Sequence, residues 1–137
     1  MNSPDDTATP YTAAPYNDVP SCLVTEHWDA STVVVSCAGV IDMITAPQLE
    51  QRLFEVLDKQ PSALVVDLSG IEFLASHGMN VLVMVRRQLA GTAGFAVVAD
   101  GPATSRPLRL IGLDDMINLC STLEEAFVKL DDEGGAR

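Results

Sequence analysis

Ser76 and His77 are neighbouring side chains whose types could support chemistry. A serine hydroxyl becomes a nucleophile when a histidine beside it removes its proton. Adjacent residues are poorly placed for proton transfer within the pair, and His27 is the other histidine that a hydrolase could use. No Gly-x-Ser-x-Gly elbow surrounds Ser76. The pattern therefore does not favour a hydrolase, and we expect no enzymatic activity.

Nucleotide chemistry is not supported either. The sequence contains neither Gly-x-Gly-x-x-Gly nor the Gly-x-x-x-x-Gly-Lys-Ser/Thr loop. The glycine-flanked stretch 91–94 precedes an expected strand rather than a helix, so we interpret it as a turn. We therefore expect no cofactor.

The three cysteines, Cys22, Cys37 and Cys120, are odd in number and lack Cys-x-x-Cys spacing. That pattern argues against a metal site and against a disulfide framework. If a turn at Asp29–Ala30 joins the first two strands, Cys22 lies opposite Cys37, where a disulfide is within reach. Because the cytosol is reducing, we predict free thiols.

The acidic composition limits the partners. The 137 residues carry a formal net charge of −11, and no Lys or Arg precedes Arg52. Such a chain repels nucleic acid and anionic lipid, so we expect neither as a partner. No apolar run approaches the roughly 18 residues of a membrane-spanning helix, and the first residues lack the basic and apolar regions of a secretory signal. We therefore expect a cytoplasmic protein.

Alternating periodicities predict one domain at 22–130, with a disordered tail at 1–21 and a short polar tail at 131–137. The expected strands are 22–28, 32–38, 63–67, 95–99 and 117–120, and the expected helices are 45–59, 76–90, 105–111 and 122–130. Residues 68–74 are expected to form a loop. A hairpin followed by alternating helices and strands predicts an α/β fold, a mixed β-sheet with helices packed against it. The helix N-termini should gather at one end of that sheet.

Capping signals mark the expected helix starts. Thr45 with Gln48, and Thr122 with Glu125, match the capping box, in which the threonine hydroxyl accepts a hydrogen bond from the backbone three residues later. Ser76 is placed to be a helix N-cap, which is worth about 1 kcal/mol.

The helix after Ser76 carries more apolar residues than one face requires. The expected core face consists of Val81, Leu82, Val85 and Leu89. Met79 and Val83 lie off that face, one turn apart. Two interpretations remain open: either this pair forms part of a protein interface, or neighbouring loops cover it.

Residues 65–87 read VVDLSGIEFLASHGMNVLVMVRR, a buried strand followed by a Ser-x-Gly turn and a helix. This stretch resembles the STAS domain of anti-sigma factor antagonists. Three further segments resemble that family in the required order: GVIDMITAP at 39–47, LIGLD at 110–114 and STLEEAF at 121–127. The resemblance covers about 22–130 and implies a STAS-type sandwich.

The resemblance also implies a partner and a switch. In that family an anti-sigma factor, which is an ATP-dependent serine kinase, phosphorylates the first serine of an Asp-Ser-Ser-Gly motif. The unphosphorylated protein binds this kinase and frees the sigma factor. By position the serine is Ser76, whereas Ala75 replaces the aspartate and His77 the second serine. The alternative is a STAS module that binds its partner without phosphorylation control, with Ser76 only a helix cap.

A partner surface around the serine follows from the resemblance and from the surplus apolar pair. The family places the loop at Asp42 near the serine, and Gly78 removes a side chain beside it. The predicted surface comprises Asp42, Ala75, Ser76, His77, Gly78, Met79 and Val83.

Overall fold

A five-stranded sheet forms the centre of the protein. The computed structural model describes residues 21–135, so the expected N-terminal tail lies outside the described residues except for Ser21. The strands, in their order across the sheet, are β1 (Cys22–Asp29), β2 (Thr32–Ile41), β3 (Ala63–Leu74), β4 (Gly94–Val98) and β5 (Asn118–Cys120). β1 is antiparallel to β2, and the other neighbouring strands are parallel. The expected mixed sheet is confirmed.

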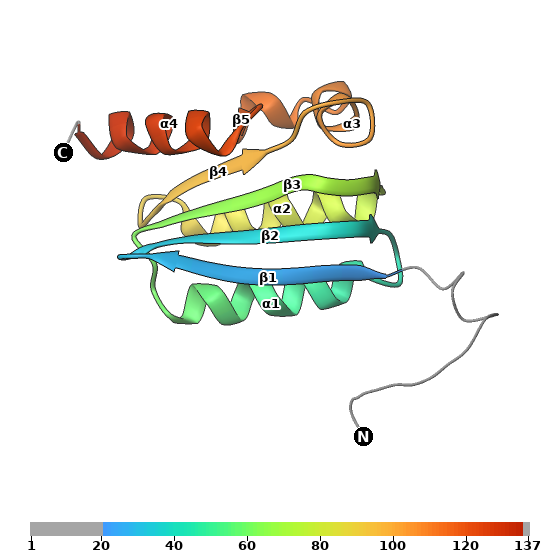
Figure 1. Ribbon diagram of the computed structural model, residues 1–137, viewed down its shortest axis with the longest axis horizontal. Helices are drawn as coiled ribbons and strands as arrows, with labels where there is room; N and C mark the ends of the chain where they lie inside the picture. Colours follow the sequence, from blue (N-terminus) through green and yellow to red (C-terminus); the bar gives the residue numbers. More distant parts are fainter. Residues whose placement is uncertain (1–20, 136–137) are drawn as a thin grey trace, which may run out of the picture.

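Helices cover both faces of this sheet. They are α1 (Ala46–Asp58), α2 (Ser76–Leu89), α3 (Ser105–Leu110) and α4 (Leu123–Gly135), with a 3-10 turn at Leu113–Asp115. Figure 1 shows α1 and α2 side by side behind the sheet. They enclose the larger apolar core, whereas α4 closes a smaller core against alternate residues of the strands. Within residues 21–135, no helix is long and apolar enough to cross a membrane.

Helix α4 extends beyond its expected end at Leu130. It continues to Gly135, so most of the expected polar tail at 131–137 is helical. The segment contains no proline or β-branched residue, and its first residues to disfavour a helix strongly are Gly134 and Gly135.

The expected loop at 68–74 is instead the second half of β3. This segment pairs with β2 through Gly70, opposite Ala38, and Leu74, opposite Ile41. The register shifts twice, each time by one extra residue in β3. These bulges place Leu68, Ile71 and Leu74 on the buried face at a spacing of three, which hides the period of two that a strand normally shows.

The hairpin register also differs from the prediction. The turn is formed by Ala30 and Ser31, so Cys22 faces Gly39, and Cys37 faces Val24. The register therefore differs by two positions from the one that placed Cys22 opposite Cys37. An even shift keeps every side chain on its own face of the sheet, so the apolar pattern could not distinguish the two registers.

Cys22 and Cys37 nevertheless lie close together, diagonally across the two strands on the face covered by α1. A hydrogen bond from the Cys37 thiol lowers the pKa of Cys22, while the same bond together with burial raises the pKa of Cys37. Cys22 is half-buried and Cys37 is buried. Within residues 21–135 none of the three cysteines forms a disulfide, and Cys120 is buried like Cys37.

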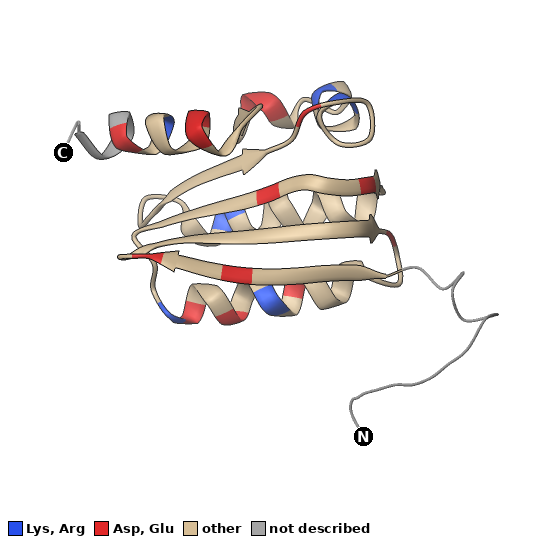
Figure 2. Cartoon of the chain, viewed as in Figure 1, with Lys and Arg blue, Asp and Glu red and all other residues tan. Residues whose placement is uncertain are grey.

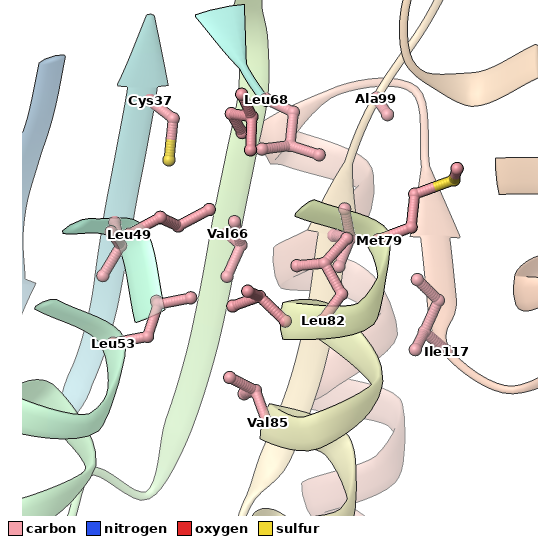
Figure 3. Packing of buried hydrophobic residues seen from close by; sticks show 14 of the residues in the cluster. Cys37, Leu49, Leu53, Val66, Leu68, Met79, Leu82, Val85, Ala99 and Ile117 are labelled. Atoms are coloured by element: carbon pink, nitrogen blue, oxygen red, sulfur yellow. The ribbon is translucent and has the colours of Figure 1, made fainter. Parts of the chain in front are cut away.

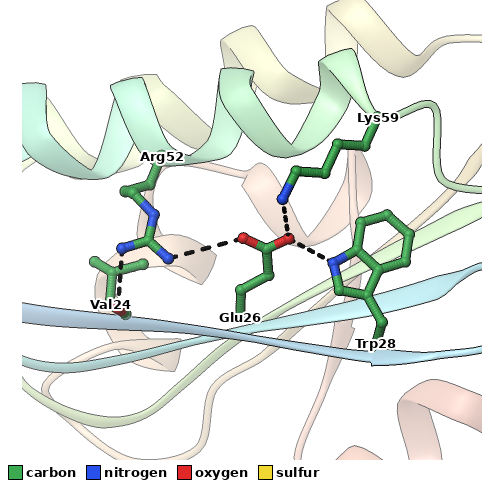
Figure 4. A network of polar contacts seen from close by, with 5 residues as sticks. All are labelled: Val24, Glu26, Trp28, Arg52 and Lys59. Carbon is green, nitrogen blue, oxygen red and sulfur yellow. Dashed lines mark hydrogen bonds and ion pairs between the residues drawn. The ribbon is translucent and has the colours of Figure 1, made fainter.

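A charged network ties the edge strand β1 to α1 (Figure 4). The Glu26 carboxylate accepts hydrogen bonds from Lys59 Nζ at 2.8 Å and from the Trp28 indole at 2.5 Å, and lies 3.8 Å from the Arg52 guanidinium. Arg52 also donates to the carbonyl of Val24 at 3.3 Å. Lys59, followed by Trp28, lowers the pKa of Glu26.

Candidate partner-binding site

The turn after β2 and the start of α2 meet at one end of the sheet. Ile41 and Leu74 are paired at the ends of two neighbouring parallel strands. The next backbone N–H, that of Ala75, donates to the carbonyl of Ile41 at 2.8 Å. The Asp42 turn is therefore beside the start of α2, as the resemblance implied.

Asp42 organises the turn that follows it. Its Oδ1 accepts the backbone N–H groups of Ile44 at 2.9 Å and of Thr45 at 3.0 Å. The Thr45 hydroxyl donates to the carbonyl of Val40 at 2.8 Å and accepts the N–H of Asp42 at 2.9 Å. The backbone hydrogen bond from Thr45 is the main cause that lowers the pKa of Asp42. The result is a closed turn with Thr45 fully buried.

The expected capping box at Thr45 is wrong. Thr45 occupies the N-cap position of α1, but its side chain makes no cap hydrogen bond because the hydroxyl serves the Asp42 turn. The second box is confirmed, since Thr122 Oγ1 accepts the N–H of Glu125 at 3.0 Å. The Glu125 carboxylate in turn accepts the N–H of Ser121 at 2.6 Å.

Ser76 is the first residue of α2 rather than its N-cap. Ala75 holds the N-cap position with extended backbone angles, and its carbonyl accepts the N–H groups of Gly78 and Met79. The bond between Ala75 N–H and Ile41 holds Ala75 beside the strand, so the N-cap lies one position earlier than expected. Ser76 and His77 are exposed. Within the described chain the Ser76 side chain makes no hydrogen bond, which leaves its hydroxyl accessible.

Gly78 and Met79 face inward, contrary to their expected place on the partner surface. A Cβ on Gly78 would overlap the side chains of Ile41 and Leu74, so this glycine lets α2 approach the sheet. Met79 is only 8% exposed and belongs to the larger core.

Val83, one turn after Met79, is half-buried against the same core. Figure 3 shows Met79 directed toward the side where Ala99 and Ile117 lie. The expectation that Met79 lies off the core is therefore wrong. Residues after β4 and before β5 close over this side of α2, which a helix considered alone cannot reveal.

Two exposed apolar side chains that sequence reasoning missed lie in the Asp42 turn. Met43 is 66% exposed and Ile44 is 56% exposed. A groove of about 410 Å³ separates the starts of α1 and α2. It is lined by Met43, Ala46, Pro47, Glu50, Ser76, His77, Asn80 and Val81. The groove joins the exposed serine to an apolar surface supplied by the turn.

The model of the STAS domain family matches residues 24–126, which is most of the chain. The chain belongs to the STAS domain family.

Relatives within that family are similar over nearly their whole length. This STAS domain is 42% identical over 107 residues to the anti-sigma-F factor antagonist RsfB of Mycobacterium tuberculosis, covering 78% of this chain and 88% of the relative. The crystal structure of an anti-sigma factor antagonist from Mycobacterium paratuberculosis matches with 43% identity and a TM-score of 0.79, covering 81% of this chain and 95% of that one.

The structure of SpoIIAA, an anti-sigma factor antagonist in its unphosphorylated form, shares the fold of this STAS domain. It is 18% identical with a TM-score of 0.66, and the match covers 80% of this chain and 97% of that one. The STAS-type sandwich expected from the sequence is therefore confirmed.

The charges near the groove of this STAS domain are acidic. Asp42 lies in the turn, Glu50 lines the groove, and Glu72 lies near the end of β3. Figure 2 shows acidic residues and no basic ones on the turn after β2 and on the last residues of β3. No Lys or Arg lines the groove among residues 21–135. A partner that fits this end of the domain would bring cationic rather than acidic side chains.

Proposed function

We propose that this protein is an anti-sigma factor antagonist that binds an anti-sigma factor of the ATP-dependent serine kinase type. The surface is the groove between the Asp42 turn and the start of α2, and the kinase phosphorylates Ser76. The observation that carries the proposal is the exposed Ser76 hydroxyl in the first turn of α2, on the wall of this groove. The similarity to RsfB over most of both chains supports it.

The start of α2 is suited to carry a phosphate. The first N–H groups of a helix have no carbonyl acceptor within it, and the positive end of the helix dipole favours an anion. Ala75 has no side-chain acceptor to occupy them. A phosphate on Ser76 would therefore be tolerated by its own domain.

The same phosphate would weaken binding of the partner. It would bring a charge of roughly −2 into a groove whose walls include Met43 and Val81. The partner would have to remove the water around that charge in order to contact the apolar wall, and this costs free energy. The proposed cycle is binding and sigma factor release while Ser76 is unmodified, and dissociation after phosphorylation.

A second candidate function is supported by Ala75. In place of the family's aspartate it presents only a methyl group at the N-cap. A STAS module without this carboxylate would bind its anti-sigma factor but would not be switched at Ser76.

The test uses the purified anti-sigma factor kinase of the same organism. Incubation with ATP should add one phosphate to the wild-type protein and none to Ser76→Ala, as measured by intact-mass spectrometry. In titrations Ser76→Ala should bind like the wild type, whereas Ser76→Glu and Ser76→Asp should bind about tenfold more weakly.

An acidic side chain in the first helical turn stabilises the helix by several tenths of a kcal/mol, so unfolding would not explain weaker binding. Equal affinities of all variants without phosphate transfer would favour the unswitched module. Absence of binding by the wild-type protein would refute both candidate functions.

A further inference from the structure

Met43 is exposed although its flanking residues are held firmly. Asp42 is half-buried and Thr45 is fully buried, and the hydrogen bonds between them close the turn around Met43 and Ile44. The N–H of Ala46 adds a bond to the carbonyl of Asp42 at 2.8 Å. A large apolar side chain presented on such a turn loses little backbone freedom when it is bound, because that freedom is already lost in the free protein.

Met43 shares the groove with Ser76. Both residues line it, together with the apolar side chains of Ala46, Pro47 and Val81. The exposed apolar surface of Met43 therefore continues into an apolar wall rather than standing alone. Interfaces commonly place such a residue at their centre, where it is fully desolvated on binding.

We propose that Met43 is the apolar anchor with which this protein recognises its anti-sigma factor, and that it enters an apolar pocket with a Lys or Arg at its rim facing Glu50. This inference rests on the proposed function and names the chemistry of the partner surface.

Charge complementarity argues for a cationic rim. Glu50 is the acidic residue that lines the groove, with Asp42 close by, and in the described part of the chain no basic side chain lines it. An acidic rim on the partner would place like charges together, which costs free energy and slows association.

The anchor also explains how the start of α2 would affect binding. A negative group at position 76 would hold water in the groove that Met43 also lines. Binding of Met43 by the partner requires that water to leave. The effects of the two positions on affinity should therefore not be additive. Ser76→Glu should weaken binding less when position 43 is already alanine than when it is methionine.

The test is a titration of the purified anti-sigma factor with Met43→Ala and with Val128→Ala. Val128 is 56% exposed on α4, which covers the opposite face of the sheet. Met43→Ala should weaken binding about tenfold or more, whereas Val128→Ala should leave affinity within about twofold of the wild type. The thermal midpoint of Met43→Ala should stay near that of the wild type because its side chain is exposed.

A charge reversal tests the rim. Glu50→Lys should weaken binding several-fold, and the loss should shrink as salt is added; Glu124→Lys on α4 is the matched control and should have little effect. Wild-type binding together with an unaffected Met43→Ala would overturn the anchor and leave the proposed function intact. A Glu50→Lys variant that binds as well as wild type would overturn the cationic rim, and a wild-type protein that does not bind at all would overturn both the anchor and the function.

Discussion

Glu26 and Asp42 each organise one region of the molecule with a single carboxylate, but they bind different kinds of donors. Glu26 accepts hydrogen bonds from the side chains of Lys59 and Trp28 and forms an ion pair with Arg52. It therefore joins β1 to α1, which are distant in the sequence. Asp42 accepts hydrogen bonds from the backbone N–H groups of Ile44 and Thr45, which follow it by two and three positions. The pKa of each carboxyl is lowered by its own set of donors.

The two arrangements have different consequences: one stabilises the fold, and the other leaves side chains exposed for a partner. A network of side chains fastens two elements together, and those side chains are then unavailable for other contacts. A carboxylate that binds mainly backbone leaves most neighbouring side chains without a partner, so Met43 and Ile44 remain exposed, and Met43 lines a groove with Ser76. The first arrangement holds the edge of the sheet, and the second shapes a surface for a partner.

Gly78→Ala should have the largest effect on stability because Gly78 packs closely against Ile41, the residue before the Asp42 turn. The added methyl group would overlap Ile41 and Leu74 and force α2 away from the sheet. Overpacking of this kind costs about 2 kcal/mol. Urea unfolding measures the change, and Asn80→Ala, on an exposed position of the same helix, is the control. Equal midpoints for Gly78→Ala and the wild type would contradict the tight contact.

Ala75→Asp should stabilise the start of α2 as Asp42 stabilises its own turn, by accepting hydrogen bonds from backbone N–H groups. Its backbone angles are those of an N-cap, and an aspartate there can accept N–H groups that Ala75 leaves without a side-chain partner. The free energy of unfolding should rise by about 1 kcal/mol, measured by urea or thermal unfolding. Ala75→Asn should give most of the gain without the charge. A loss of stability in both variants would show that the cap geometry is not productive.

Glu26→Gln should have a smaller effect that depends on salt. The substitution removes the charge that attracts Lys59 and Arg52, and such partly exposed pairs contribute up to about 1 kcal/mol. The difference from the wild type should shrink in high salt, because salt screens exposed pairs. Asp42→Asn keeps an oxygen acceptor for the backbone, so its effect on stability should be nearly independent of salt. The same salt dependence for both variants would remove the distinction between the two carboxylates.

The smallest expected effect is the change in the free energy of unfolding at acid pH that follows from protonation of Glu26. Its pKa in the folded protein lies below the usual 4.5, so its stabilising contribution is present above that pH and is lost as the pH falls through the lowered value. Glu26→Gln should therefore approach the wild type in stability as the pH falls below 4.5. Asp42, whose pKa is lowered from 3.8, should lose its contribution as the pH falls through that lowered pKa, below 3.8. Unfolding curves across this range measure both, and a constant gap between Glu26→Gln and wild type would argue against the lowered pKa.

Sequence patterns predicted the elements of the fold because strong periodicities and turn residues separate them. The second half of β3 was missed since two bulges change its spacing and Ser69–Gly70 resembles a turn. The partner surface was predicted only in part. Ser76 and His77 are exposed beside the Asp42 turn, but Met79 lies in the core because a distant segment covers it.

Met43 was overlooked for the opposite reason. An apolar pair between Asp42 and Thr45 gives no periodic signal, and its exposure follows from hydrogen bonds of the turn that no sequence pattern announces. Local patterns therefore predicted elements well, whereas exposure of single side chains depended on contacts between elements.

The contact between Cys22 and Cys37 makes the three thiols chemically unequal. Cys22 is half-buried with a lowered pKa, whereas Cys37 is buried with a raised one and Cys120 is buried. Because thiolates and not thiols react with alkylating reagents, a maleimide dye should attach first to Cys22. The native chain thus offers one preferred attachment point for a fluorophore, at the first residue of β1, from which the arrival of a partner at the neighbouring end of the sheet can be followed without engineering any cysteine.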